Sequence, residues 1–137
     1  GEHLIVSELD RAISQACAAT GCTVSDYAAG AVVPSVEGAQ GHHVLVVEFQ
    51  ADGTVPDFDP FTAHVDHALQ DENDDYRAHR SGDFGVGPPH LLVARPGMFA
   101  AWMKRRGKLG GQNKVPRIIT APDLLADLCR FAEAFQG

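Results

Sequence analysis

One stretch of the chain concentrates positive charge, and its residue types suit the binding of a phosphate. Between Asp83 and Asp123 the sequence has no acidic residue, yet it holds seven of the chain's eleven lysines and arginines. The whole chain is acidic, with a formal net charge of -7. A local cationic field within an acidic body favours compact anions over long polyanions. We therefore expect this stretch to handle a nucleotide or an acyl phosphate.

Within this stretch, Lys114 has the best position to contact an anion. It follows a glycine-rich connection and precedes Pro116, which restricts the backbone beyond it. The glycines of that connection are Gly107, Gly110 and Gly111. A long side chain on such a hinge can reach an anion that arrives from another domain, and Arg117 can add a forked contact to phosphate or carboxylate. The alternative is a solvated basic loop, which is what most charge runs form.

Two other phosphate-binding signatures are absent from the sequence. A Walker loop requires G-x-x-x-x-G-K-[ST], whereas Lys114 stands between Asn113 and Val115. No G-x-G-x-x-G follows an expected strand, so there is no dinucleotide fingerprint. Any phosphate contact in this chain must therefore use a different arrangement.

Metal binding and nucleophilic catalysis have weaker support. His64, His67 and Asp71 follow one helical face, but no second ligand group with its own spacing accompanies them. Exposed histidines on an acidic helix explain this pattern better, and we expect no metal site. The chain has no G-x-S-x-G elbow. Its three cysteines lie in or near expected helices, with no basic partner identified for any of them.

Length and composition bound the class of protein. At 137 residues, with 45% hydrophobic residues, the chain fits one globular domain over 1–137. No apolar run approaches the roughly 18 residues of a membrane span, and the N-terminus shows no signal peptide. Three cysteines without a C-x-x-C pair indicate reduced thiols and a cytoplasmic protein. The acidic balance argues against nucleic-acid binding.

The first half of the chain predicts a helix, two strands and a long helix. The first helix covers 7–20, with Ser7 as its N-cap and Gly21 as its stop. Strands at 23–33 and 43–49 follow as an antiparallel pair, and we expect Gly30 to interrupt the first of them. The long helix covers 60–81, with Asp59 as its cap and Pro60 at its first position.

The second half predicts shorter elements. A strand at 91–94 should be parallel to its neighbour, because a long helix separates the two. A helix over 97–106, a short strand at 117–120 and a final helix capped by Thr120 complete the chain. We expect the final helix to bury Leu124, Leu128, Phe131 and Phe135. Together these elements predict a small two-layer α/β (α+β) domain, in which a mixed sheet of three to four strands packs with about four helices.

Four ordered segments make the chain resemble a known family. They are residues 43–48 (His-Val-Leu-Val-Val-Glu), the spacing Leu69-x-x-x-Asn73-x-x-Tyr76-x-x-x-Arg80, residues 97–99 (Gly-Met-Phe) and residues 112–117 (Gln-Asn-Lys-Val-Pro-Arg). This order resembles the C-terminal domain of the auxin-responsive Gretchen Hagen family, and the resemblance covers essentially the whole chain. The segment 112–117 is its most specific part. Glu48 is unusual at the end of an apolar strand, where it pairs with a cation or faces water.

The resemblance implies a function that the residues alone do not give. The Gretchen Hagen family are acyl-acid amido synthetases of the acyl-adenylate-forming superfamily. Their chemistry uses ATP with magnesium to form an acyl-adenylate, and an amino acid then attacks it to give an amide and AMP. The C-terminal domain acts as a lid over a large N-terminal adenylation domain. By this resemblance Lys114 reaches the adenylate phosphate, with Gln112 and Arg117 as further phosphate contacts and the glycines as a hinge.

Two departures and two alternatives accompany this interpretation. The family often has Tyr where this chain has His43 and Asn113. The ATP-binding motifs and the acid pocket belong to the large domain, so we expect the chain to be inactive alone and to bind no cofactor by itself. One alternative is a standalone module that binds a small phosphorylated ligand. Another is an interaction domain that uses a metal at His64 and His67.

Overall fold

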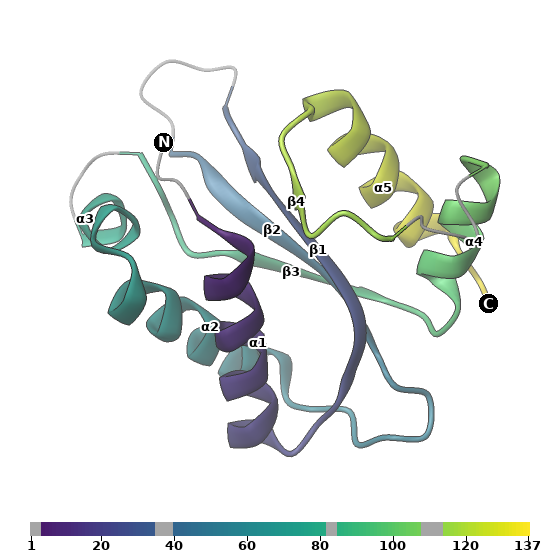
Figure 1. Ribbon diagram of the computed structural model, residues 1–137, viewed down its shortest axis with the longest axis horizontal. Coiled ribbons are helices and arrows are strands. Elements are labelled where there is room, and N and C mark those ends of the chain that lie inside the picture. Colours follow the sequence, from purple (N-terminus) through teal and green to yellow (C-terminus); the bar gives the residue numbers. More distant parts are fainter. Residues whose placement is uncertain (1–3, 35–39, 82–84, 108–113) are drawn as a thin grey trace.

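The computed structural model describes residues 4–34, 40–81, 85–107 and 114–137 (Figure 1). Within these residues the chain forms five helices and four strands. In chain order they are α1 (Val6–Thr20), β1 (Val24–Val32), β2 (His42–Phe49), α2 (Phe58–Glu72), α3 (Asp74–Ser81), β3 (His90–Ala94), α4 (Met98–Arg105), β4 (Ile118–Ile119) and α5 (Pro122–Ala134). No helix in the described ranges has the length and apolar character that crossing a membrane requires.

The strands form one mixed sheet in the order β3-β2-β1-β4. β1 and β2 are antiparallel, as the sequence predicts, and β3 runs parallel to β2 after the intervening helices. β4 pairs in parallel with the middle of β1, through Ala29 with Ile118 and Gly30 with Ile119. The predicted class, a small α+β domain built on a mixed sheet, is confirmed.

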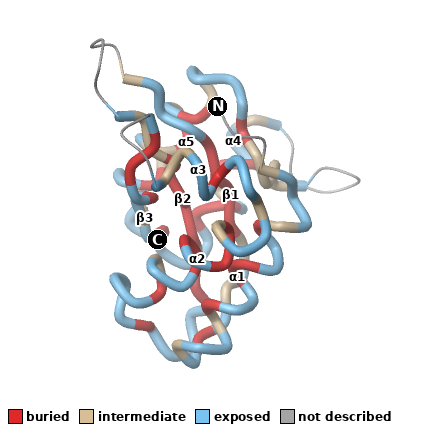
Figure 2. The backbone as a smooth tube through the Cα atoms, turned by 90° about the vertical axis from the view of Figure 1, so that its left-hand side faces the viewer, coloured by how far each residue is buried: buried red, intermediate tan, exposed pale blue. Residues whose placement is uncertain are grey.

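The helices divide between the two faces of the sheet, which adds a layer to the two-layer arrangement expected. α1, α2 and α3 pack on one face, where Leu9, Phe61 and Tyr76 are fully buried. α4 and α5 pack on the other face, where Phe99, Trp102 and Leu128 are fully buried. Figure 1 shows the two groups of helices on opposite sides of the strands, and Figure 2 shows that the central strands are mostly buried. Successive strand residues point to opposite faces, so both cores draw on the same strands.

The first helix ends where predicted but begins earlier. Gly21 has a left-handed φ of 72°, and its N–H donates to the Cys17 carbonyl, so it closes the helix. The N-cap is Ile5 and not Ser7. Glu8 takes over the capping role, because its Oε1 accepts a hydrogen bond of 3.2 Å from the Ile5 N–H.

The long helix predicted over 60–81 is wrong, because the chain leaves helical geometry at Asn73. Asn73 has φ of -132° and ψ of 108°, which separates α2 from α3. Its Oδ1 accepts the Tyr76 N–H at 2.8 Å, and its Nδ2 donates to Glu8 at 3.0 Å. The side chain of Asn73 therefore caps α3 and ties the break to α1. At the other end, α2 begins at Phe58 and its N-cap is Asp57. This cap lies two residues before the predicted cap, Asp59.

Two smaller expectations also need correction. Gly30 does not interrupt β1, which runs unbroken through it. α5 has Ala121 as its N-cap and not Thr120. Its most buried residues are Leu125, Leu128 and Ala132, whereas the other predicted core residues, Leu124, Phe131 and Phe135, are only partly buried. The buried stripe of α5 is therefore rotated from the predicted one.

Candidate functional site

Lys114 lies on the segment that leads into β4, and its side chain is exposed. No hydrogen bond or ion pair joins it to another described residue. The next residue, Val115, packs against the core beneath α4 and α5. Gly107, at the start of the predicted hinge, has a left-handed φ of 71°. The other predicted hinge and contact residues, Gly110, Gly111 and Gln112, lie outside the described residues.

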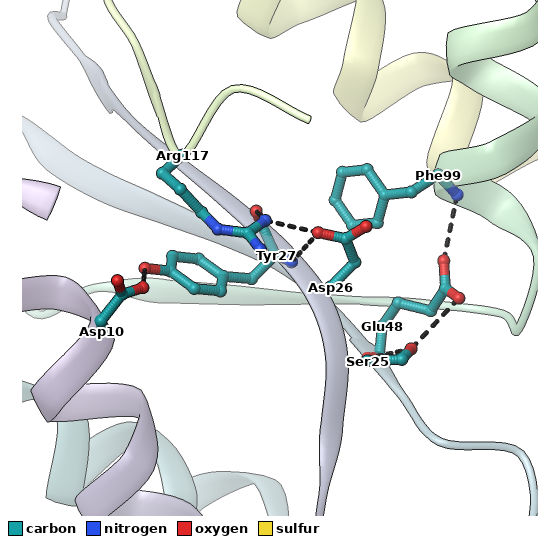
Figure 3. A network of polar contacts seen from close by, with 7 residues as sticks. All are labelled: Asp10, Ser25, Asp26, Tyr27, Glu48, Phe99 and Arg117. Carbon is teal, nitrogen blue, oxygen red and sulfur yellow. Dashed lines mark hydrogen bonds and ion pairs between the residues drawn. The ribbon is translucent and has the colours of Figure 1, made fainter. Parts of the chain in front are cut away.

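Arg117 has a different environment, although it is only three residues further along. Its Nη1 forms an ion pair with Asp26 and donates to the Tyr27 carbonyl at 2.7 Å. Its guanidinium carbon lies 4.5 Å from the centre of the Tyr27 ring, which adds a cation–π contact. The Arg117 carbonyl accepts the Ala29 N–H at 2.8 Å. These contacts fix the start of β4 to β1 (Figure 3).

The network around Arg117 continues to α1. The Tyr27 hydroxyl donates a short hydrogen bond to Asp10 on α1. Burial raises the pKa of Tyr27, and the hydrogen bond to the Asp10 carboxylate raises it further, so the phenol stays protonated. A surface hollow of about 370 Å³ lies beside this network, between α1 and the first half of β1. Arg117 is the cation on the wall of this hollow, and Asp10 and Asp26 are its acids.

Glu48 has a role that sequence reasoning missed. Among the residues that the structure describes, no cation pairs with its carboxylate, which accepts hydrogen bonds instead. Its Oε1 accepts the Phe99 N–H at 3.0 Å, and its Oε2 accepts the Gly97 N–H at 3.1 Å. The Ser25 hydroxyl shares its one hydrogen between the Glu48 carbonyl oxygen at 3.0 Å and the same Oε2 at 3.2 Å. Glu48 therefore caps the N-terminus of α4 from the neighbouring strand, and the only signal in the sequence was an acid at the end of an apolar strand.

The remaining cations of the acid-free stretch divide into engaged and exposed groups. Arg105 pairs with Asp127 on α5, which also accepts the Trp102 Nε1–H at 3.0 Å. Arg106 lies over the Trp102 ring, 4.7 Å from its centre. Lys104 is exposed on α4, like Lys114 on its segment. Arg105, Arg106 and Arg117 are thus engaged within the fold. Arg95, just before α4, is exposed as Lys104 and Lys114 are, so Lys114 is one of three exposed cations outside these contacts, in the described part of this stretch, that can meet an external anion.

The geometry gives little support to metal binding or to a cysteine nucleophile. Among the described residues, no group of three or more His, Cys, Asp or Glu side chains could hold a metal, so His64 and His67 have no third ligand there. Burial raises the pKa of Cys17 to about 11, with the neighbouring Cys22 adding to the effect. Burial likewise raises the pKa of Cys129. The thiol and not the thiolate is therefore the main form of these cysteines near neutral pH.

Comparison with known proteins identifies the family. The sequence model described as the GH3 family C-terminal domain matches residues 7–123, which is most of the chain. The chain belongs to the GH3 family. The resemblance to the Gretchen Hagen C-terminal domain is thus confirmed, and the matched range includes the strand with Glu48 and the Lys114 segment.

The similar proteins are plant amido synthetases of much greater length. The chain is 33% identical over 131 residues to indole-3-acetic acid-amido synthetase GH3.8 of Oryza sativa subsp. indica. It is 29% identical over 136 residues to the probable indole-3-acetic acid-amido synthetase GH3.9 of Oryza sativa subsp. japonica. Each alignment covers 87% of this chain, but only 21% and 30% of those GH3 proteins.

Solved structures of the GH3 family share the fold. The GH3.15 acyl acid amido synthetase superposes with a TM-score of 0.68 at 23% identity, over 93% of this chain and 23% of that one. The AtGH3.15 acyl acid amido synthetase in complex with 2,4-DB gives a TM-score of 0.71 at 22% identity, over 96% of this chain and 26% of that one. This GH3 chain therefore corresponds to about a quarter of those enzymes.

Proposed function

We propose that this chain works as the mobile C-terminal lid of an ATP-dependent acyl-acid amido synthetase, and that it is inactive without an N-terminal adenylation domain. Membership of the GH3 family supports the enzyme class, because the relatives it matches are named amido synthetases. The short span relative to those proteins supports a partner domain. The observation that carries the residue-level proposal is the exposed Lys114 on a segment whose far end is fixed by Arg117.

The proposed reaction has two balanced steps. A carboxylate oxygen of the acid attacks the α-phosphorus of ATP, so that an acyl-adenylate forms and pyrophosphate leaves. The amine of an amino acid then attacks the acyl carbon, AMP leaves, and the amine loses a proton as the amide forms. Lys114 supplies positive charge near the phosphate where negative charge increases, which lowers the barrier only if the lysine is in place during the step.

Arg117 fits an anchoring role in this proposal better than the phosphate contact predicted for it. Its Nη1 is already engaged by Asp26 and the Tyr27 carbonyl. Contact with a phosphate through the remaining N–H groups stays a prediction. Magnesium accompanies ATP, and we assign it to the adenylation domain together with the ATP-binding motifs, because Mg²⁺ is usually held by one or two carboxylates and the phosphates of the nucleotide itself.

A substitution in the joined enzyme tests the role of Lys114. The chain is expressed in one frame behind the N-terminal portion of a GH3 amido synthetase, and pyrophosphate release and amide formation are measured. We expect Lys114→Ala to lower kcat/KM for adenylate formation by about 100-fold, since one charged contact to a transition state contributes about 3 kcal/mol.

The matched control is Lys104→Ala, which removes the same charge from another exposed position of the acid-free stretch. It should retain activity within about twofold, because Lys104 is part of α4 and not of the hinged segment. If Lys114→Ala also stays within about twofold, in both half-reactions, the proposed role of the lysine is wrong.

The second candidate is a standalone module for a small phosphorylated ligand. The observation that favours it is the set of exposed cations in the acid-free stretch, such as Lys104 and Lys114. The hollow beside Arg117 gives it less support, because its lining has two acids, Asp10 and Asp26, against one cation. The two candidates differ in one measurable property: a module binds AMP by itself, whereas a lid shares its ligand with another domain.

A further inference from the structure

Two of the cysteines meet at the turn that leads from α1 into β1. Cys17 lies in the last turn of α1, and Cys22 lies between that helix and β1. The Cys22 N–H donates to the Cys17 carbonyl at 3.1 Å, and the Gly21 N–H donates to the same oxygen at 2.8 Å. These bonds and the left-handed Gly21 close the helix. In helix ends of this kind the side chains at the positions of Cys17 and Cys22 frequently contact each other.

The backbone holds the two cysteines within the span of a disulfide. With standard bond lengths, the hydrogen bond of 3.1 Å limits the separation of their Cα atoms to at most about 7 Å. Disulfides usually join Cα atoms that are about 4.4 to 6.8 Å apart. The thiols also interact, because Cys22 contributes to the raised pKa of Cys17. The two sulfur atoms can therefore meet through rotation of the side chains, with α1 and β1 in place.

A reagent in solution can reach this pair from the hollow of about 370 Å³ between α1 and β1, because both cysteines line it. Cys17 is partly exposed, whereas Cys22 is only 9% exposed. The Thr20 hydroxyl donates to the Ala16 carbonyl at 2.7 Å, so the sulfur is the donor in its contact of 3.4 Å with Cys22. Cys17 is thus the thiol that a reagent meets first, and Cys22, held by Thr20, is the second.

We infer that Cys17 and Cys22 form a thiol–disulfide site, which a small disulfide such as oxidised glutathione converts to an intramolecular disulfide. The Cys17 thiolate attacks one sulfur of the oxidant, the S–S bond of the oxidant breaks, and one glutathione leaves. The Cys22 thiolate then attacks the sulfur of Cys17, this mixed disulfide breaks, and the second glutathione leaves. The protein loses two electrons and two protons, and the two released glutathione thiols carry them. This site is independent of the proposed function, in which neither cysteine takes part.

The protonation state of the pair makes the exchange slow at neutral pH and its product persistent. Burial raises the pKa of Cys17 to about 11, so that only a trace of thiolate is present near neutral pH. A trace is too little for a catalytic nucleophile, but a slow stoichiometric exchange requires no more. The reduced pair also lacks the stabilised thiolate that makes some protein disulfides easy to reduce. The disulfide should therefore remain until a dithiol reducing agent is added.

Mass spectrometry of the chain during incubation with oxidised glutathione tests this inference. A Cys129→Ser variant removes the third thiol, and the unchanged chain is measured beside it. The expected product lacks two hydrogens, carries no glutathione and is not alkylated at either remaining cysteine, and dithiothreitol restores the starting mass. Its rate of formation should rise about tenfold for each pH unit between pH 7 and pH 9, as the thiolate fraction of Cys17 does.

Single variants separate the two thiols. Cys22→Ser should stop the reaction at the mixed disulfide, so that glutathione stays on Cys17. Cys17→Ser should acquire glutathione at least about tenfold more slowly than Cys22→Ser does, because Cys22 is buried. Equal rates in the two variants, or a rate that does not change with pH, would overturn the assignment of Cys17 as the attacking thiol.

The unchanged chain decides the inference even if a variant fails to fold. A chain that retains glutathione on Cys17, or that keeps both hydrogens at the higher pH, would show that the two thiols do not join. Thermal unfolding of the oxidised and reduced forms adds a structural check. The oxidised form should unfold at the higher temperature, because the cross-link restricts the unfolded chain. A lower unfolding temperature would show that the disulfide distorts the turn after α1, and this result too would overturn the inference.

Discussion

At the scale of single residues, Asp66 is a buried carboxylate, and hydrogen bonds from its neighbours offset the free energy lost when its charge is removed from water. It is only 6% exposed, on the face of α2 that packs toward α3. Arg80 donates to it at 2.9 and 2.6 Å, and the Tyr76 hydroxyl donates at 2.6 Å. In the motif Asn73-x-x-Tyr76-x-x-x-Arg80, Tyr76 and Arg80 thus donate hydrogen bonds to this carboxylate. The third residue, Asn73, caps α3, the helix that carries the other two. The motif is therefore explained by the attachment of α3 and requires no role in catalysis.

Removing this carboxylate should be costly. Asp66→Asn should lower the free energy of unfolding by about 3 kcal/mol, because it leaves the half-buried Arg80 without its charged partner. Asp74→Asn is the control, since its pair with Arg77 is exposed and should contribute less than about 1 kcal/mol. Urea unfolding of the three proteins measures both values. Equal losses in the two variants would contradict the assignment.

The same site predicts a pH dependence of stability. Burial opposes ionisation of Asp66, but the hydrogen bonds from Arg80 and Tyr76 outweigh it and lower its pKa below the ordinary value. The unfolded chain therefore binds a proton at higher pH than the folded chain does, and the stability from this group is lost as pH falls below about 4. The difference in unfolding free energy between the unchanged chain and Asp66→Asn should shrink between about pH 6 and pH 3. A constant difference would show that the folded-state pKa is not lowered.

At the scale of elements, the close approach of α5 to β1 depends on Gly30. A Cβ atom at that position would lie 2.7 and 2.8 Å from the two methyl carbons of Leu125 and 3.0 Å from the Ile119 carbonyl oxygen. Leu125 is buried, so its side chain has little room to move away. The glycine is therefore required by packing, and β1 continues through it without a break.

Gly30→Ala should push α5 away from the sheet. We expect a loss of about 1 to 3 kcal/mol in the free energy of unfolding, which is the usual cost of overpacking a core. Gly53→Ala is a matched control, because its Cβ would meet only the Gln50 side chain and carbonyl at 3.5 Å. Thermal unfolding of both variants compares them. A Gly30→Ala variant as stable as Gly53→Ala would contradict the tight packing of α5.

The elements also show which parts of the fold the sequence could predict. The hydrophobic pattern located most helices and strands. The apolar run 43–49, for example, is typical of a strand covered on both faces, and β2 is such a strand. The break at Asn73 could not be predicted, since it depends on a hydrogen bond to Glu8, 65 residues away in the sequence. The capping role of Glu48 is equally non-local, because its partners lie 49 and 51 residues further along. For the site, charge segregation indicated Lys114 but could not distinguish it from Arg117, whose anchor Asp26 comes from β1.

At the scale of the whole molecule, the sheet separates layers of different character. α2 and α3 carry the exposed acids Asp71, Glu72, Asp74 and Asp75, whereas Lys104 and Lys114 belong to the side with α4 and α5. A long polyanion would meet repulsion from the acidic layer, but a compact phosphate on the other side would not. The chain also spans only about a quarter of the length of its relatives. The charge distribution and this short span both support our proposal that the chain shares one small anion with a partner domain.

The most direct test of that shared site is calorimetric titration with AMP. The ligand is added separately to the chain alone, to the N-terminal portion of a GH3 amido synthetase, and to the two joined in one frame. We predict no detectable binding to the chain alone. We also predict tighter binding by the joined protein than by the N-terminal portion, and this gain should disappear in Lys114→Ala but persist in Lys104→Ala. Micromolar binding by the chain alone, or an unchanged affinity in the joined Lys114→Ala protein, would contradict the account.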